Sequence, residues 1–333
     1  MVLRAALLVG VHVLGAPAKA PELPPAPVTL TVTPGAGTAA WEMSITNTGA
    51  SPVRIPADPR LLVLELTPQV PGKKGAAPTC QLPDDARPAT DEERELVIPA
   101  KRTWSATFDP LFYCFGARER AALVSGTKVT PRFGFTSKAK AGPYAVAPVG
   151  ASVGKVAPAK IIDGVAFTIA DGATAPPAPV GDEKATWLSV PEAADVGRGA
   201  EIGTTVSLHN TGDRAITLLY RPEFLAFRVI SPSGAVACGS TKQVAAPIRE
   251  LFSTVRPKGR ADLSILVTAV CPAGTFDEPG IYRVMPRLDT TGASGQSLGL
   301  KSWDSTATAK TPLLLRVRTA RRPSTNTTLP TLD

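Results

Sequence analysis

The sequence of 333 residues has no long apolar stretch after residue 20. A helix that crosses a bilayer needs roughly 20 consecutive apolar residues, so we expect no stable membrane insertion. Two motifs are also missing: a glycine-rich phosphate loop followed by Lys and Ser or Thr, and a basic cluster interleaved with aromatic residues. Nucleotide chemistry therefore has no support, and we expect no nucleic-acid partner.

Histidine and aromatic residues are scarce. The chain has two histidines, His12 and His209, and aromatic residues make up 5% of it. Only His209 lies outside the N-terminal segment, so a site that needs several imidazole ligands is not expected, and we assign no metal and no cofactor. The low aromatic content means that the cores must be built mainly from Leu, Val, Ile and a few Phe.

Residues 1–20 have the three parts of an export signal. Arg4 provides the positive charge, residues 5–15 form a short apolar stretch, and Ala18-Lys19-Ala20 matches the A-x-A cleavage pattern. The alternative, a membrane-spanning helix, requires a longer apolar stretch. We therefore expect a signal peptide that is cleaved after Ala20 and a mature protein that is periplasmic or extracellular.

The chain contains an internal repeat. Residues 41–67 align without a gap on residues 204–230, which places Asn47-Thr48-Gly49 on Asn210-Thr211-Gly212. Two cysteines follow at matched spacing in each copy. We interpret this pattern as an internal duplication, which predicts two domains of similar fold, each long enough to bury its own core.

The four cysteines predict two disulfides. Four cysteines allow three pairings, and the duplication favours one bridge within each copy, Cys80–Cys114 and Cys238–Cys271. A metal site is the alternative, but it would need more ligands than the chain offers. Because each cysteine follows an expected strand, we expect the bridges to tie loops or strand ends.

Composition and residue pattern predict an all-β fold. Pro 34 and Gly 28 are too many for helical domains of this size, and both residues mark turns. Trp41, Met43 and Ile45 alternate with polar residues, which is the period of a half-buried strand. About seven short strands per copy favour two tandem Ig-like or fibronectin-like antiparallel β-sandwiches.

The expected organisation has six parts. They are a signal peptide at 1–20, a Pro-rich, extended and solvated lead at 21–27, a β-sandwich at 28–170, a Pro-rich linker at 171–184, a second β-sandwich at 185–318, and a disordered tail at 319–333.

The repeats resemble bacterial Ig-like envelope modules. In the second copy the resemblance is carried by the stretch Val206-Ser207-Leu208-His209-Asn210-Thr211-Gly212, residues 224–232, Ser233-Gly234, and Arg256-Pro257-Lys258-Gly259 ahead of Leu263. The layout is also similar to BsuPI-type proteinase-inhibitor domains, which are β-sandwiches of this general plan. The resemblance implies the fold, and it implies either binding in the envelope or inhibition of a proteinase.

Two segments match the G-x-S-x-G pattern of hydrolases, around Ser152 and Ser297. That motif requires a preceding strand, a following helix and a histidine later in the chain. Neither segment precedes a helical pattern, no histidine follows Ser297, and none lies in the first domain. We therefore assign no catalytic residue.

Three further sets of residues have a possible functional interpretation. Carboxylates between the first two cysteines could serve glycosidic chemistry or Ca²⁺, but without calcium-loop spacing we interpret them as a solvated loop: Asp84, Asp85, Asp91, Glu92, Glu93 and Glu95. Strand alternation predicts that His209 faces solvent. The tryptophans are interpreted as core or domain-edge residues, with sugar stacking as the alternative: Trp41, Trp104, Trp187 and Trp303.

The sequence favours a non-catalytic binding or structural protein of the cell envelope. We expect a protein or an envelope polymer as the partner, contacted through loops or exposed strand edges. The formal net charge of +8 is interpreted as a mildly cationic surface. The alternatives are a secreted proteinase inhibitor of BsuPI-like type and, with less support, a carboxylate-dependent hydrolase.

Overall fold

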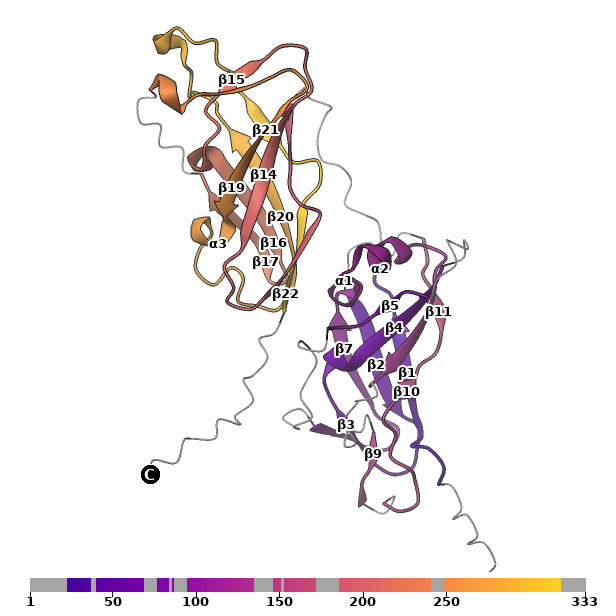
Figure 1. Ribbon diagram of the computed structural model, residues 1–333. Coiled ribbons are helices and arrows are strands. Elements are labelled where there is room, and N and C mark those ends of the chain that lie inside the picture. The colour runs from indigo at the N-terminus through magenta and orange to yellow at the C-terminus, as the bar shows by residue number, and fades with distance from the viewer. Residues whose placement is uncertain are drawn as a thin grey trace, which may run out of the picture.

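The computed structural model describes residues 23–36, 40–68, 77–83, 86, 95–134, 146–150, 153–171, 186–240 and 248–318. Across these residues the protein is all-β, with short helical turns between strands, and Figure 1 shows the strands in two groups. The buried apolar side chains form two clusters, one within residues 26–169 and one within residues 188–317. We call the corresponding parts the N-terminal half and the C-terminal half.

The N-terminal half contains sheets β1-β2-β7, β10-β8-β4-β5 (with β11 beside β8) and β6-β3-β9. Its strands are β1 (Val28–Thr33), β2 (Trp41–Asn47), β3 (Val53–Pro56), β4 (Leu62–Thr67), β5 (Thr79–Cys80), β6 (Glu95–Ile98), β7 (Thr103–Phe108), β8 (Lys128–Phe133), β9 (Ala147–Pro148), β10 (Ile162–Asp163) and β11 (Phe167–Thr168). Its helical turns are η1 (Pro59–Leu61), α1 (Pro110–Tyr113) and α2 (Ala117–Ala122).

The C-terminal half contains sheets β12-β14-β19, β13-β22-β20-β16-β17 (with β21 beside β20) and β15-β18. Its strands are β12 (Thr186–Ser189), β13 (Ala193–Gly197), β14 (Gly203–Asn210), β15 (Ile216–Leu218), β16 (Leu225–Ser231), β17 (Gly234–Gly239), β18 (Ser253–Val255), β19 (Arg260–Leu266), β20 (Gly280–Asp289), β21 (Thr306–Thr308) and β22 (Leu313–Arg318). Its helical turns are η4 (Pro222–Phe224), η5 (Arg249–Leu251), α3 (Val267–Val270) and η6 (Gln296–Leu298).

The alternation of apolar and polar residues determines which face of each strand is buried. In β14, Val206 and Leu208 are fully buried, and they belong to the same apolar cluster as Phe227 and Val229 of β16. Because β14 and β16 lie in different sheets, this shared core joins two sheets face to face, as in a β-sandwich. The predicted all-β sandwich architecture is therefore confirmed.

The Asn-Thr-Gly turn makes the same contacts in both halves. Each asparagine is buried, its amide group donates to three backbone carbonyls, and its carbonyl oxygen accepts from the glycine that follows. Asn47 hydrogen-bonds to the backbone oxygens of Ser51, Ile98 and Pro99 and to the backbone nitrogen of Gly49, at 2.9–3.2 Å. Asn210 hydrogen-bonds in the same way to the oxygens of Arg214, Val255 and Arg256 and to the nitrogen of Gly212, at 2.8–3.2 Å. An asparagine with all its hydrogen-bonding groups satisfied fixes the turn against the strand connection behind it.

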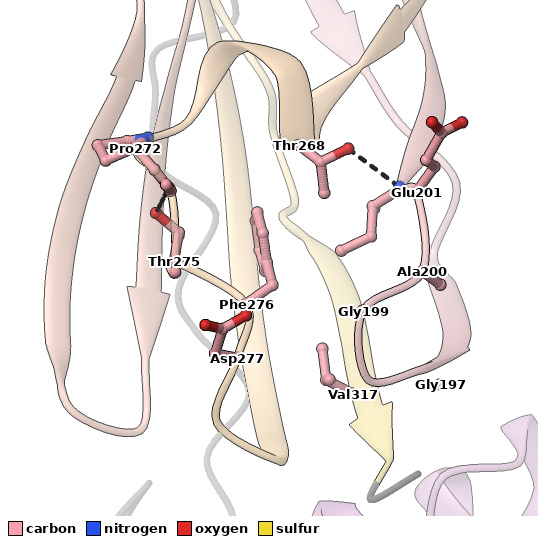
Figure 2. A pocket seen from close by; sticks show the side chains of 13 residues that line it. Gly197, Gly199, Ala200, Glu201, Thr268, Pro272, Thr275, Phe276, Asp277 and Val317 are labelled. Carbon is pink, nitrogen blue, oxygen red and sulfur yellow. Dashed lines mark hydrogen bonds between the residues drawn. The ribbon is translucent and has the colours of Figure 1, made fainter.

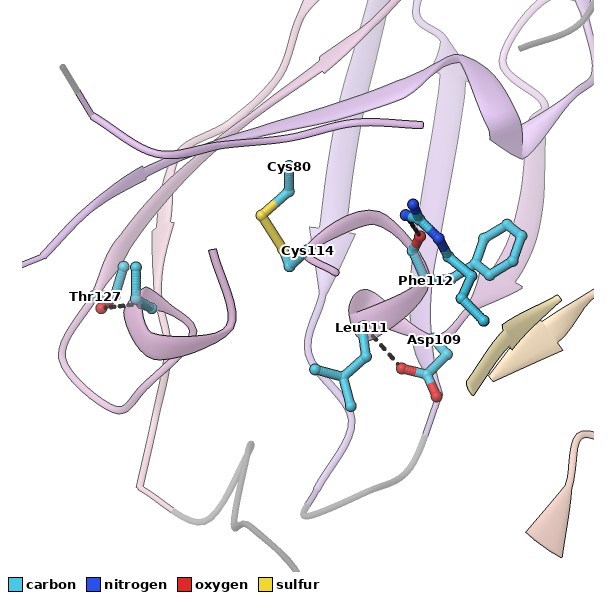
Figure 3. The surroundings of a disulfide bond; sticks show 8 residues. Cys80, Asp109, Leu111, Phe112, Cys114 and Thr127 are labelled. Carbon is cyan, nitrogen blue, oxygen red and sulfur yellow. Dashed lines mark hydrogen bonds between the residues drawn. A yellow bond between two sulfur atoms is a disulfide. The ribbon is translucent and has the colours of Figure 1, made fainter. Parts of the chain in front are cut away.

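Both predicted disulfides, Cys80–Cys114 and Cys238–Cys271, are present. Figure 3 shows the first beside α1, where the carboxylate of Asp109 accepts a hydrogen bond from the Leu111 amide at 2.9 Å. Cys114 and Cys271 each follow a one-turn helix directly. Their partners lie on edge strands, which corrects the expectation that every cysteine follows a strand: Cys80 ends β5, and Cys238 lies within β17.

Several local features differ from the sequence prediction. The short helices α1, α2 and α3 and the parallel pairing of β13 with β22 were not predicted. The lead is not fully solvated, because Ala26 is buried and Pro25 forms a bridge with Ala157. The expected signal peptide, the tail and most of the linker lie outside the described residues.

The two halves contact each other through α1 and α2 of the N-terminal half and through β20, β22 and Glu192 of the C-terminal half. Arg316 of β22 donates to the Phe112 carbonyl oxygen at 3.0 Å, and its guanidinium carbon lies 4.5 Å from the centre of the Phe115 ring. Arg120 of α2 pairs with Glu192 at 2.7 Å. Phe115 is buried although it is not part of the N-terminal core cluster, so its burial belongs to this contact.

Candidate functional site

Of the six acidic residues that the sequence analysis singled out between the first two cysteines, the structure describes only Glu95. It begins β6, and its carboxylate pairs with the Arg54 guanidinium at 3.3 Å. The other predicted members lie outside the described residues: Asp84, Asp85, Asp91, Glu92 and Glu93. Within the described residues there is no group of three His, Cys, Asp or Glu side chains that could hold a metal ion.

The second G-x-S-x-G segment does not form the strand–serine–helix arrangement of a hydrolase. Ser297 is exposed in the middle of η6, a single 3₁₀ turn that a loop connects to β20. Ser152 of the first segment lies outside the described residues. The described geometry therefore supplies no nucleophile elbow at Ser297.

His209 lies on the outer face of β14, but it is not simply solvated. Its ring stacks on Trp187 with the ring centres 4.1 Å apart, and its Nε2 lies 2.8 Å from Ser189 Oγ. Burial lowers the pKa of His209 below its ordinary value of 6.5. The positive charges of Arg260 and Lys310 lower it further, against the opposing effect of Asp262. The ring is therefore neutral at physiological pH and packs as an aromatic side chain.

The tryptophans offer little free ring surface for a sugar. The ring of Trp187 on β12 stacks on His209 of the neighbouring strand β14. Lys310 Nζ also lies over the Trp187 ring, 4.6 Å from its centre. Trp41 is fully buried. Trp104 and Trp303 pack partly buried against the two cores. The interpretation of the four residues as core or edge residues agrees with these positions.

The C-terminal half has a small pocket next to its disulfide (Figure 2). Its volume is about 210 Å³, and it lies between the turn after β13 and the turn that follows Cys271. Phe276 and Val317 provide apolar walls, while Glu201 and Asp277 stand exposed at its edge. Ligand pockets usually have volumes of about 300–1,000 Å³, so this one suits a small group at most.

The two threonine hydroxyls of this pocket already hydrogen-bond to the chain itself. Thr268 Oγ1 accepts from the Ile202 amide at 3.3 Å, and Thr275 Oγ1 donates to the Pro272 carbonyl at 2.7 Å. A second depression, of about 550 Å³, lies along β14 and β19. Its lining includes Thr205, Ser264 and Leu266 but no charged side chain.

The outer face of the β16–β20 pair carries three arginines. Burial alternates along both strands, with Phe227 and Val284 facing the core and Arg228, Arg283 and Arg287 facing outward. Arg228 is paired in register with Met285, so it lies diagonally between the other two arginines. We call the surface formed by Arg228, Arg283 and Arg287 the arginine face.

The sequence interpretation missed this surface, although the internal repeat contains the signal for it. The gapless alignment that matches Asn47 with Asn210 also places Glu65 on Arg228, a reversal of charge at an outward-facing strand position. In that alignment the buried and turn residues of the two copies agree, so the charge reversal distinguishes their outward faces.

No protein-family model matches the chain, and no curated protein sequence matches it. Among solved structures, red sea bream transglutaminase is 10% identical, with 88% of this chain and 31% of that chain covered. The TM-score is 0.19, which is too low to carry an argument about this chain. The chain thus spans less than a third of the length of that structure.

Proposed function

We propose that the protein is an exported, non-catalytic binding protein of the cell envelope, built from two tandem Ig-like domains that arose by duplication. The observation that carries the binding role is the arginine face on the broad sheet of the C-terminal half, where Arg228 and Arg287 are exposed and Arg283 is half-buried. Arginine is the residue best suited to charged recognition, because its planar guanidinium donates paired hydrogen bonds to carboxylate or phosphate groups.

The disulfides support the exported location. Two bridges with no free cysteine among the described residues fit a non-cytoplasmic protein, because thiols stay reduced in the cytosol. The expected signal peptide at residues 1–20 agrees with this location. No helix in the described part of the chain has the length and apolar character needed to cross a membrane.

The location is tested by expressing the full chain with its own N-terminus in a bacterial host. We expect mature protein in the periplasm or the medium that begins at Pro21 and has no titratable thiol. Full-length protein that stays in the cytosol with reduced cysteines would contradict the proposal.

The binding role is tested by capture from envelope extract on immobilised protein. We expect one envelope component to be retained at a defined stoichiometry, and we expect free wild-type protein to compete for it. Retention no greater than on an unrelated disulfide-bonded β-sandwich would contradict the binding role.

Titration of proteinases with the protein distinguishes the alternative, proteinase inhibition, from envelope binding. A stoichiometric loss of activity in a panel of serine, cysteine and metalloproteinases would favour inhibition over envelope binding. The binding proposal predicts no loss at a molar excess of the protein.

A further inference from the structure

The arginine face has a regular geometry. Arg228 lies opposite Met285, Arg287 opposite Ala226, and Arg283 opposite Ile230, so the three arginines follow one another at two-residue steps along the strand direction. Two residues of a strand span about 6.6–6.8 Å. Diagonal neighbours on one face of an antiparallel pair are about 7–8 Å apart, which keeps adjacent guanidinium groups within reach of one partner segment.

The surroundings leave the central arginine open. On its other side Arg228 is paired with Ala237 of β17, whose side chain is too small to cover a guanidinium. No ion pair or hydrogen bond of the Arg228 side chain is found within the described residues. Two carboxylates act on the flanking arginines. Asp289 lies 3.5 Å from Arg287. Burial raises the pKa of Asp109 in the N-terminal half, and the positive charge of Arg283 acts in the opposite direction.

The matched face of the N-terminal half is neutralised by its own residues. There Glu65 of β4 holds the position of Arg228, and Lys128 and Arg132 of β8 hold those of Arg283 and Arg287. Glu65 pairs with Arg132 at 2.8 Å, and Asp163 lies 3.6 Å from the same arginine. The same sheet position therefore supports an internal ion pair in one half and an unpaired cation in the other.

We propose that the arginine face binds an extended acidic segment of a partner protein, with carboxylates at alternate positions. This inference rests on the binding role proposed above and names the chemistry of the partner. Alternate side chains of an extended chain are also about 6.6–6.8 Å apart on one side, which matches the steps between the arginines. Met285 lies between Arg283 and Arg287 on β20, and Ile230 lies opposite Arg283. These apolar side chains favour a polypeptide over a uniformly charged polymer.

The test uses the full disulfide-bonded chain and three probes. The first is a blocked peptide with three Glu residues alternating with Thr; the second has the same composition with the Glu residues contiguous; the third is inorganic polyphosphate. The key variant is Arg228→Glu, which reproduces the pairing of Glu65 with Arg132 and therefore keeps the sheet folded. Arg249→Glu is the matched control, because it makes the same charge change at an exposed position outside this sheet.

We expect the alternating peptide to bind wild type and Arg249→Glu equally, and Arg228→Glu about tenfold more weakly or not at all. Binding to wild type should weaken as salt rises from roughly 0.05 to 0.15 M, because the contacts are exposed. Equal affinity for Arg228→Glu, no binding to wild type, or equal binding of the contiguous peptide or polyphosphate would each overturn the inference.

Failure of this inference can be told apart from failure of the binding role. If Arg228→Glu retains the component captured from envelope extract as well as wild type does, the protein binds, but through another surface. If wild type captures nothing, the binding role itself has failed.

Discussion

At matched positions of the two halves, Asn47 and Asn210 make the same buried hydrogen bonds, whereas Glu65 and Arg228 carry opposite charges. The shared contacts lie in the turns, the disulfides and the cores, where the fold constrains the residue. The difference lies on an outward sheet face, where packing does not constrain the charge. We therefore expect the binding function to depend on outward-facing positions at which the two halves carry different residues.

The largest effect is expected from the disulfides. Replacing both cysteines of one bridge by alanine should lower the free energy of unfolding of that half by about 3–4 kcal/mol in the chain-entropy model. The two bridges span 34 and 33 residues, so the pair Cys80→Ala with Cys114→Ala and the pair Cys238→Ala with Cys271→Ala should cost nearly the same. Differential scanning calorimetry of both double variants tests this. A large loss of stability from only one pair would show that the two disulfides do not stabilise their halves equally.

The second-largest loss of stability is expected from replacing the buried asparagines. Asn47→Ala and Asn210→Ala each leave buried backbone groups without partners, and each should destabilise its half by about 2–3 kcal/mol. Urea unfolding followed by circular dichroism measures the loss. Thr48→Ala and Thr211→Ala at the adjacent exposed positions are the controls and should cost less. A tolerated Asn210→Ala beside a damaging Asn47→Ala would show that the two turns differ in energy despite their matched contacts.

Alkaline pH should destabilise the C-terminal half more than the N-terminal half. Burial raises the pKa of Tyr282 from 10.0 to about 12, and it also raises the pKa values of Tyr220 and Tyr113. A raised folded-state pKa gives stability that is complete below pH 10 and is lost as pH rises toward 12. The C-terminal half holds two of these tyrosines and should therefore lose more stability over this interval.

Urea unfolding of wild type and Tyr282→Phe between pH 9 and 12 measures this effect. The variant loses the hydrogen bond from the Tyr282 hydroxyl to the Glu278 carbonyl, which should cost about 1 kcal/mol at neutral pH. Its stability should nevertheless fall less steeply above pH 10. Identical pH slopes for the two proteins would remove Tyr282 as the cause.

The smallest effects on stability are expected from reversing the charge of Glu65 or Arg228, and the two changes should have opposite signs. Glu65→Arg breaks the ion pair with Arg132 and gathers three cations, which should destabilise the protein by about 0.5–1 kcal/mol. Arg228→Glu should stabilise it by about 0.5 kcal/mol or less, because the new carboxylate can pair with Arg287. Thermal unfolding of both variants at low salt provides the measurement. A destabilised Arg228→Glu would show that Arg228 has a structural role.

Much of the fold could be predicted from the sequence, because burial on one face of a strand leaves a period-two pattern. Trp41, Met43 and Ile45 marked β2 in this way, and matched cysteine spacing gave the disulfide pairing. The one-turn helix α1 was missed because four residues carry no helical period. Asp109 as N-cap before Pro110 was its only local signal. β13 was missed because Ala and Gly residues alternate too weakly to mark a strand.

The candidate site was harder to predict than the fold. The stacking of His209 on Trp187 depends on the register of β12 with β14, which a single sequence does not determine. The arginine face depends on the pairing of β16 with β20, whose residues are far apart in the chain. Only the charge difference between Glu65 and Arg228 was present in the aligned repeats.

The most direct test of the difference between the two faces is a chemical-shift map of the full chain titrated with the alternating acidic peptide. Binding by the C-terminal face predicts shifts at the amides of Arg228, Met285 and Arg287, and none at Glu65 and Thr130 on the matched face of the N-terminal half. Shifts of equal size on both faces, or on neither, would contradict the claim that the difference between the halves carries the function.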